Sequence, residues 1–302
     1  MRSVTQTPFK LKLPKSGKAP LRSRLIAGLS LGLVLAAIQL CWAAERTALK
    51  PGWNLFTPEQ DIQVGQEASR KVEQQLPLLR DERVDNYLDA LGKRLAAHAP
   101  GYKYPYQYRA VNDEAINAFA LPGGFIYVNR GVIEAADNEA QLAGVIAHET
   151  SHVALRHGTA QATKASAWQI PLSLLGAATG NSLGGLLTQL GAGFTLNSIL
   201  LKYSRDDESQ ADVLGTQILY DSGYDPRALA QFFEKIEAES KGKQPAQFFS
   251  DHPNPGNRTE RVSEEVDKLG GPEPNYRTDS DDFHSIKVYV MKLPKPPKPA
   301  GK

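Results

Sequence analysis

Apolar and polar positions along this chain follow helical spacing in several segments and strand-like spacing in one region. Thr57-Pro58-Glu59 favours a capped helix start with proline at the first helical position. Pro122-Gly123-Gly124 favours a turn between two short aromatic and β-branched segments, 106–112 and 125–129, which we predict to be strands. Apolar residues recur at helical spacing in the segments 138–153 and 203–222, and we also predict helices at 57–76, 81–99 and 226–240. The pattern therefore predicts an α+β fold that is mainly α, with a small sheet.

The first 44 residues have a different pattern, which predicts export. Residues 1–24 carry seven basic side chains and no acidic one, and residues 25–44 are uncharged. A basic segment followed by an apolar one is typical of a signal peptide or an N-terminal membrane anchor. Cys41 would suit lipid attachment, but Leu40 stands where such sites need a small residue. We therefore expect the remainder to lie in the periplasm or at a membrane of the cell envelope.

The charge balance changes when this leader is set aside. The whole chain has 35 basic and 33 acidic residues, a net charge of +2. Without the seven basic residues of 1–44 it has 28 basic and 33 acidic residues, or about −5. The sequence thus gives no reason to expect a nucleic-acid partner. Cys41 is the only cysteine, so residues 45–302 have no disulfide and a metal site there must use nitrogen and oxygen ligands.

The predicted helix at 138–153 contains the sequence His148-Glu149-Thr-Ser-His152. Two histidines four residues apart lie on one helix face, where both can bind one zinc ion. Glu149 then lies near the zinc-bound water and can take its proton. The longer HExxHxxGxxH form needs a glycine at 155 and a histidine at 158, but the chain has Leu155 and Gly158. We expect His157 to end this helix, with Gly158 as the stop signal.

The third zinc ligand can come from the predicted helix at 203–222. Glu208 and Asp212 lie four residues apart on one face, so Glu208 could bind zinc while Asp212 accepts a hydrogen bond from a ligating histidine. Alternatively, Glu208 and the preceding acids Asp206 and Asp207 only complement the helix dipole. Asp207 also remains a rival ligand.

Four segments in order resemble one family. HETSHVALRHG from position 148, SRDDESQAD from 204, the segment 117–128 and the segment 252–258 are similar to the HtpX and CAAX-prenyl-protease type of zinc metallopeptidase, over residues 61–266. Its bacterial envelope proteases are the most similar members. The resemblance implies a zincin-like domain with its sheet beside the HExxH helix. It also implies His148, His152 and Glu208 as zinc ligands, Glu149 as general base and Asp212 as partner of a ligand.

The segment 117–128 is expected to include the edge strand that holds the substrate. Extended backbone offers hydrogen bonds to any peptide, so an edge strand can bind protein or peptide substrates as an added strand. An ordinary core strand is the alternative. Asn117 is either a residue that orients substrate or one that satisfies local backbone. The predicted substrate strand comprises Asn117, Ala118, Phe119 and Ala120.

Two further residues follow in the proline-rich segment 252–258. His252 is either solvent-exposed or, as the resemblance suggests, packed over the active site, where it could occupy the open zinc position as a latch. Arg258 is a candidate for stabilising the oxyanion of the tetrahedral intermediate. Equally, it could form an ion pair at the start of a helix over 258–268.

The chain is thus divided into a leader (1–44), a metallopeptidase domain (45–270) and an extension (271–302) with a disordered Pro/Lys-rich tail. Within the domain, the uncharged segment 165–201 could pack as a core hairpin, cover the cleft, contact a membrane or envelope protein, or span the bilayer. We predict a zinc endopeptidase that acts on proteins of the cell envelope, and the resemblance implies misfolded or damaged proteins as its substrates. The alternatives are a zinc-containing, chaperone-like binding module and an integral membrane protease.

Overall fold

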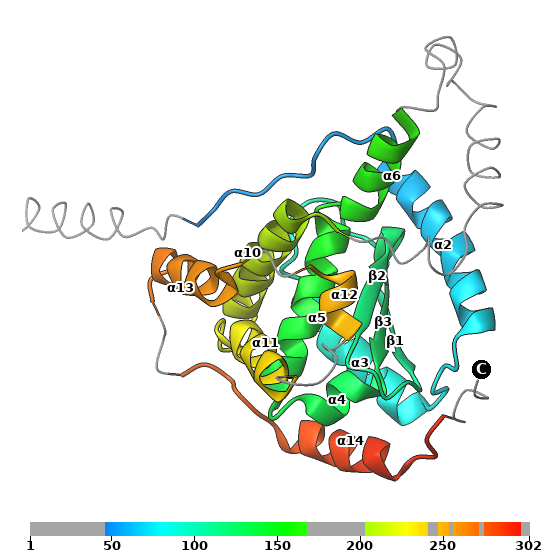
Figure 1. Ribbon diagram of the computed structural model, residues 1–302, viewed down its shortest axis with the longest axis vertical. Helices are drawn as coiled ribbons and strands as arrows, with labels where there is room; N and C mark the ends of the chain where they lie inside the picture. Colours follow the sequence, from blue (N-terminus) through cyan, green and yellow to red (C-terminus); the bar gives the residue numbers. More distant parts are fainter. Residues whose placement is uncertain (1–45, 168–202, 241–246, 254–255, 272–274, 297–302) are drawn as a thin grey trace, which may run out of the picture. The chain divides into compact units, whose positions relative to one another are not determined.

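The computed structural model describes residues 46–167, 203–240, 247–253, 256–271 and 275–296 (Figure 1). The leader 1–44 and nearly all of the uncharged segment 165–201 lie outside these residues, so the predictions made for them stay predictions. Among the described helices, none combines the length and the hydropathy needed to cross a bilayer.

Two helices precede the sheet, as the sequence predicts. Helix α2 (Pro58–Gln75) begins with a capping box, in which Thr57 and Gln60 satisfy each other's backbone N–H groups. Helix α3 (Glu82–Ala96) begins at Asp81, whose carboxylate accepts from two backbone N–H groups of the first turn. Helix α3 buries an apolar stripe consisting of Val84, Leu88, Leu91 and Leu95. Local capping and periodicity therefore suffice for both helices.

The sheet has three strands in the order β1-β3-β2. Strand β1 (Gln107–Val111) is parallel to β3 (Phe125–Asn129), and β2 (Ala118–Leu121) pairs antiparallel with β3. The one-turn helix η1 (Pro122–Gly124) joins β2 to β3, with Gly123 at φ 76°. A side chain on Gly123 would lie 2.5 Å from the Cα of Ile62, so the turn also needs glycine for close packing on α2. The order leaves β2 at one edge.

Helix α5 (Glu139–Ala154) is the centre of the fold, and every one of its residues is buried. It follows the short helix α4 (Arg130–Ala135) and packs on the sheet with one side and on the helices that follow with the other (Figure 1). A helix enclosed on all sides loses its amphipathic pattern, which explains why apolar and small residues surround its polar motif.

The predicted end of α5 is wrong. The helix stops at Ala154, and His157 begins the next helix, α6 (His157–Ala167), with Gly158 inside it. The break lies at Arg156, whose φ of 59° is left-handed. The buried carboxylate of Asp61 holds the Arg156 side chain through its Nε at 2.6 Å. A long-range ion pair therefore fixes the turn, which helix-stop signals do not reveal.

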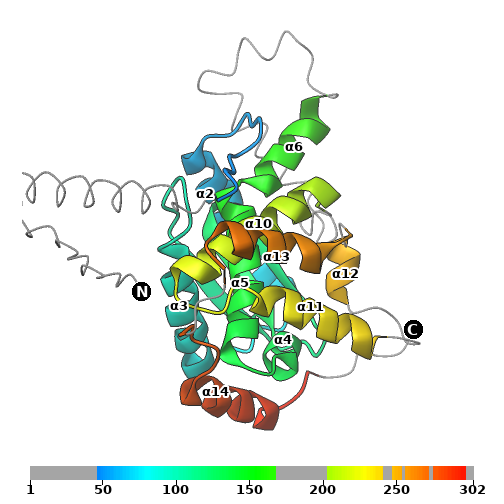
Figure 2. The same ribbon diagram turned by 90° about the vertical axis from the view of Figure 1, so that its left-hand side faces the viewer.

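Five helices complete the described part of the domain. Helix α10 begins with a capping box between Ser204 and Asp207, and α13 packs beside α10 and α11 (Figure 2). The helices are α10 (Arg205–Asp221), α11 (Ala228–Glu239), α12 (Gln247–Asp251), α13 (Arg258–Lys268) and α14 (Asp281–Lys292). Helices predicted at 203–222, 226–240 and 258–268 are thus confirmed.

Helix α14 joins the same core, although it lies in the range expected to be an extension. Phe283, Ile286 and Val290 are buried in the main hydrophobic cluster. Fully buried Arg130 holds the end of this helix, because its guanidinium donates to the carbonyl oxygens of Val290 at 2.6 Å and Pro294 at 3.0 Å. Ordered structure therefore reaches beyond residue 270.

Candidate metal centre

Four side chains from three regions of the chain converge at the centre of the fold. His148 and His152 come from α5, Glu208 from α10, and His252 directly follows α12. All four are buried, and one ligand atom of each lies within 4.8 Å of the others. Of the two positions considered for His252, exposed to solvent or packed over the site, the structure has the second, because the residue is buried in the cluster.

The spacing within this cluster suits a metal ion. The Nε2 atoms of His148 and His152 lie 3.1 Å apart. His148 Nε2 lies 3.3 Å from Glu208 Oε2, and His152 Nε2 lies 3.4 Å from Glu208 Oε1. Ligand atoms in tetrahedral positions around zinc lie roughly 3.3 Å apart, given Zn–N and Zn–O bonds of about 2.0–2.2 Å. Neutral imidazole and carboxylate are also ligands that zinc prefers. The residues therefore fit the ion that the motif implies.

Close approach of α10 to α5 brings Glu208 to the two histidines. Gly215 of α10 faces the backbone of His148, and a side chain on Gly215 would lie 3.3 Å from its backbone nitrogen. On the other side of α5, Gly144 contacts α11, where a side chain would lie 2.9 Å from the Cα of Leu229. Small residues at these two contacts set the distance between helices.

Asp212 and Arg258 surround the cluster with charge. Asp212 Oδ1 lies 3.2 Å from His148 Nδ1, on the side away from Glu208. Arg258 donates through Nε to Asp212 Oδ2 at 2.7 Å and through Nη2 to Glu208 Oε2 at 3.1 Å. Arg258 is therefore placed as an ion-pair former that holds both acids, the second of the two roles considered for it.

The rival ligand Asp207 lies outside the cluster. Its Oδ2 accepts hydrogen bonds from the Ser204 hydroxyl at 2.7 Å and from Gln161 Nε2 at 2.9 Å. These bonds keep Asp207 at the N-terminus of α10, where a carboxylate also complements the helix dipole. The dipole role thus belongs to Asp207, while Glu208 points inward.

Burial and mutual interaction shift the protonation of these groups. Burial lowers the pKa of His148, but Asp212 and Glu208 outweigh this effect and raise the pKa to about 9. Burial alone would raise the pKa of Glu208, yet the neighbouring His252, His148 and His152 hold that pKa well below its usual value. A carboxylate that stays ionised when buried is suited to bind a cation.

Glu149 lies beside the cluster with unused hydrogen-bonding capacity. It is fully buried, and within the described structure neither carboxylate oxygen has a hydrogen-bond partner. Its nearest charged neighbour is His252, whose Nε2 lies 3.5 Å from Oε1. Burial raises the pKa of Glu149. A buried carboxylate that accepts no hydrogen bond is costly, which indicates a chemical rather than a structural task.

The edge of β2 that is not paired with β3 faces the same cluster. Asn117 O accepts from the backbone of Asn129 on β3, so the carbonyls of Ala118 and Ala120 point to the other side. There, the carbonyl oxygen of Ala118 lies 3.3 Å from His252 Nε2, and that of Ala120 accepts from the Tyr203 hydroxyl at 3.4 Å. The predicted edge position is thus observed, and side chains occupy the edge.

Other residues of the predicted substrate strand point elsewhere. Asn117 Nδ2 donates to Asp251 at 2.8 Å, so Asn117 ties β2 to the end of α12. Phe119 stacks on Tyr127 of β3, with ring centroids 5.1 Å apart. His252 itself stacks on Phe248 at 4.2 Å. These contacts fix the position of the β2 edge relative to the His252 segment.

Two residues of the site were missed by sequence reasoning. His157 Nδ1 lies 2.9 Å from His152 Nδ1, and burial lowers the pKa of His157 to about 4. Tyr203 stacks on the His152 ring, with centroids 3.8 Å apart and planes inclined by 17°. The sequence signal that could have indicated these two residues is their position: Tyr203 lies just before the helix of Glu208, and His157 lies just after the HExxH motif.

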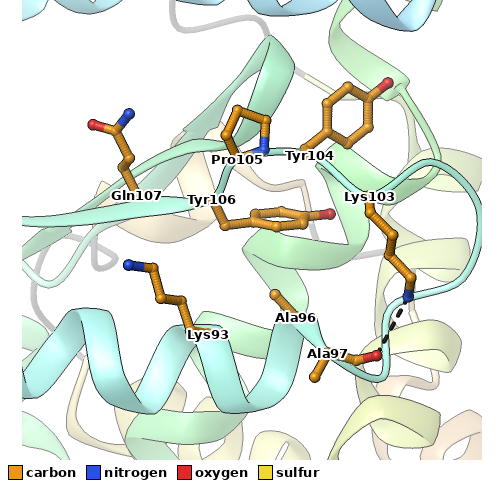
Figure 3. Close-up of a pocket in the computed structure, with 8 residues that line it drawn as sticks. All are labelled: Lys93, Ala96, Ala97, Lys103, Tyr104, Pro105, Tyr106 and Gln107. Carbon is orange, nitrogen blue, oxygen red and sulfur yellow. Dashed lines mark hydrogen bonds between the residues drawn. The ribbon is translucent and has the colours of Figure 1, made fainter.

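A concavity lies away from the metal centre, between α3 and the segment leading into β1 (Figure 3). It has a volume of about 530 Å³. Lys103 lies at one end and donates through Nζ to the Ala97 carbonyl (Figure 3). Its lining residues are Lys93, Ala96, Ala97, Lys103, Tyr104, Pro105, Tyr106 and Gln107. None of these belongs to the cluster around His148.

The class of protein that this fold and this site define is the metallopeptidases built around an HExxH helix. The sequence profile of Peptidase family M48 matches residues 82–266, more than half of the chain, and the chain therefore belongs to this family. The broader HtpX and CAAX-protease resemblance is thereby narrowed, and the mostly helical fold with a small sheet is confirmed.

Three relatives show how far the similarity extends. The chain is 31% identical over 239 residues to the beta-barrel assembly-enhancing protease of Escherichia coli, which covers 77% of this chain and 48% of that protein. It is 31% identical over 180 residues to the mitochondrial metalloendopeptidase OMA1 of Schizosaccharomyces pombe, or 59% and 52% of the two chains. The metalloprotease LoiP of Escherichia coli is 29% identical over 193 residues, or 63% and 71%. The chain thus spans about half the length of the first two relatives.

Proposed function

We propose that this protein is a zinc-dependent metalloendopeptidase that hydrolyses peptide bonds of misfolded or damaged proteins in the cell envelope. The observation that carries the proposal is the buried convergence of His148, His152 and Glu208. Beside them lies the carboxylate of Glu149, which has no hydrogen-bond partner among the described residues. Membership of Peptidase family M48 supports the peptidase activity. The leader pattern and the name of the beta-barrel assembly-enhancing relative support the envelope as compartment.

In the proposed mechanism His148, His152 and Glu208 would hold the ion. Zinc held there would supply Lewis acidity, which would lower the pKa of a water molecule and polarise the scissile carbonyl. Glu149 accepts the proton of the attacking water at a carboxylate oxygen and returns it to the nitrogen of the leaving amine. Burial raises the pKa of Glu149 towards the operating pH, which suits a group that must first accept a proton and then donate it.

We further propose that His252 keeps the centre latent. Its Nδ1 lies 3.0 Å from Glu208 Oε1 and its Nε2 faces the Ala118 carbonyl, so the ring stands between the metal ligands and the β2 edge. A substrate that adds to β2 as a strand needs that carbonyl. Substrate binding would therefore have to displace His252. Contact with a membrane or an envelope protein through 165–201 also stays a proposal.

The deciding experiment compares the wild type with Glu149→Gln in metal content and in cleavage of an unfolded protein such as casein. We expect both proteins to bind one zinc ion and only the wild type to cleave. Unchanged cleavage by Glu149→Gln would remove this residue from the mechanism. Glu208→Gln should weaken zinc binding, and normal zinc content in that variant would reassign the third ligand.

The second candidate is a zinc-containing, chaperone-like module with little cleavage. The β2 edge favours this candidate, because the carbonyls of Ala118 and Ala120 that a substrate strand would use already contact His252 and Tyr203. Cleavage by His252→Ala separates the two functions. Faster cleavage by this variant than by the wild type supports a latent peptidase. No cleavage by either protein, with zinc bound to both, supports the binding module.

A further inference from the structure

The two histidines of the HExxH motif have different partners behind them. His148 Nδ1 faces a carboxylate, since Asp212 Oδ1 lies 3.2 Å away. His152 Nδ1 faces another imidazole instead, with His157 Nδ1 at 2.9 Å. His157 is itself buried, with 3% of its surface exposed. The motif is therefore asymmetric in what orients its two ligands.

Metal binding through Nε2 dictates what the opposite nitrogen must do. An imidazole that gives the Nε2 lone pair to a metal carries its proton on Nδ1, and that buried N–H needs an acceptor. For His152 the Nδ1 atom of His157 is within reach to accept it. His157 must then be neutral, with its own proton on Nε2, which lies 3.9 Å from Asp207 Oδ1. Asp207 is held in turn by Ser204 and Gln161.

We infer that His157 is a positioning residue, whose Nδ1 accepts a hydrogen bond from His152 Nδ1–H and so directs His152 Nε2 at the metal. The inference rests on the proposed zinc centre. It adds a link from the HExxH helix through His157 towards the N-terminus of α10, so one ligand is oriented by the turn after its own helix. Tyr203, stacked on the His152 ring, restricts the same side chain.

The break between α5 and α6 makes this contact possible. On a continuous helix two residues five apart point about 140° away from each other. Here α5 stops at Ala154, and Arg156 turns the chain with a φ of 59°, so that His157 returns towards His152. Arg156 Nε donates to Asp61 Oδ2 at 2.6 Å, and Tyr104 donates to the same oxygen at 2.6 Å. A buried network therefore holds the turn that presents His157.

The test replaces His157 with leucine, asparagine or glutamine and measures zinc affinity by competition with a chelator. Asparagine places an acceptor oxygen near the former Nδ1 position, glutamine places it near the Nε2 position, and leucine has none. We expect His157→Leu to weaken zinc binding about 10–100-fold, as partners of metal-bound histidines generally do. We expect His157→Asn to bind within about threefold of the wild type.

A second readout separates orientation of His152 from general damage. The visible spectrum of the cobalt-substituted protein reports ligand geometry, and we expect it to change in His157→Leu and to be retained in His157→Asn. If leucine destabilises the metal-free fold, the asparagine and glutamine variants decide, with asparagine binding zinc about tenfold more tightly. Equal zinc affinity in all variants and the wild type would overturn the role of His157 alone. A wild type that binds no zinc would overturn the proposed function and this inference with it.

Discussion

Replacing Arg258 with methionine should strongly destabilise the metal-free protein. The guanidinium is 5% exposed and makes two short hydrogen bonds to Asp212 and Glu208, which are fully buried. It also lies over the Phe233 ring, 4.1 Å from the centroid. Methionine retains much of the packing but removes the guanidinium that pairs with both buried carboxylates.

The expected loss follows from these contacts. Removing one partner of a buried ion pair costs about 3–5 kcal/mol, because the other charge stays buried and unpaired. For a domain of this size each kcal/mol lowers the melting temperature by about 2–4 °C, so the shift should be roughly 6–20 °C. With zinc bound the loss should be smaller, since the ion supplies positive charge to Glu208.

Thermal and urea unfolding with and without zinc measure both quantities. Arg261→Met is the matched control, because Arg261 lies on the same helix. Among the described residues its guanidinium has only a long 3.5 Å contact, from Nη1 to the Gly256 carbonyl. It should change stability by at most about 0.5 kcal/mol. Equal losses in the two variants would refute the ion-pair reasoning. If Arg258→Lys folds and binds zinc normally but loses about 10²–10³-fold in turnover, the oxyanion role applies instead.

Three further predictions concern packing, the last helix and the metal. Gly65→Ala should destabilise despite alanine's better helix propensity, because its Cβ would lie 1.9 Å from a backbone oxygen of η1; Gly52→Ala, with open space around it, should be neutral in urea unfolding. Arg130→Met should release the end of α14, so hydrogen exchange there should accelerate while Arg70→Met, at an exposed position, leaves it unchanged. Zinc at about 100 times its dissociation constant should stabilise the fold by about 2.7 kcal/mol, and a melting temperature of His148→Ala that still followed zinc would exclude this site.

Much of the fold could be predicted because local rules decide it. The capping box at Thr57, the turn at Pro122–Gly124 and the helical spacing around the HExxH motif each operate within a few residues. The motif also places His148 and His152 together without knowledge of the rest, since four residues make about one helical turn. Local rules thus predict most of the described helices and strands, and two of the four residues of the metal centre, His148 and His152.

The remainder of the centre depends on contacts between distant segments. The sequence does not distinguish Glu208 from Asp207 as a ligand. Only the packing of α10 on α5 turns Glu208 inward and leaves Asp207 at the start of the helix. His157 was misassigned because the Arg156–Asp61 pair, which bends the chain, joins residues 95 positions apart. His252 could be placed only once β2 and α12 were positioned. No periodic pattern reports such pairings.

Direct contact between α5 and α10 also determines where this domain can tolerate change. The two helices that carry the ligands touch through Gly215, while the chain leaves α6 at Ala167 and returns before Arg205. Because the two helices meet at this glycine, a larger side chain there would push the residues of the metal centre apart directly. Position 215 is therefore among those where this domain should accept exchange least.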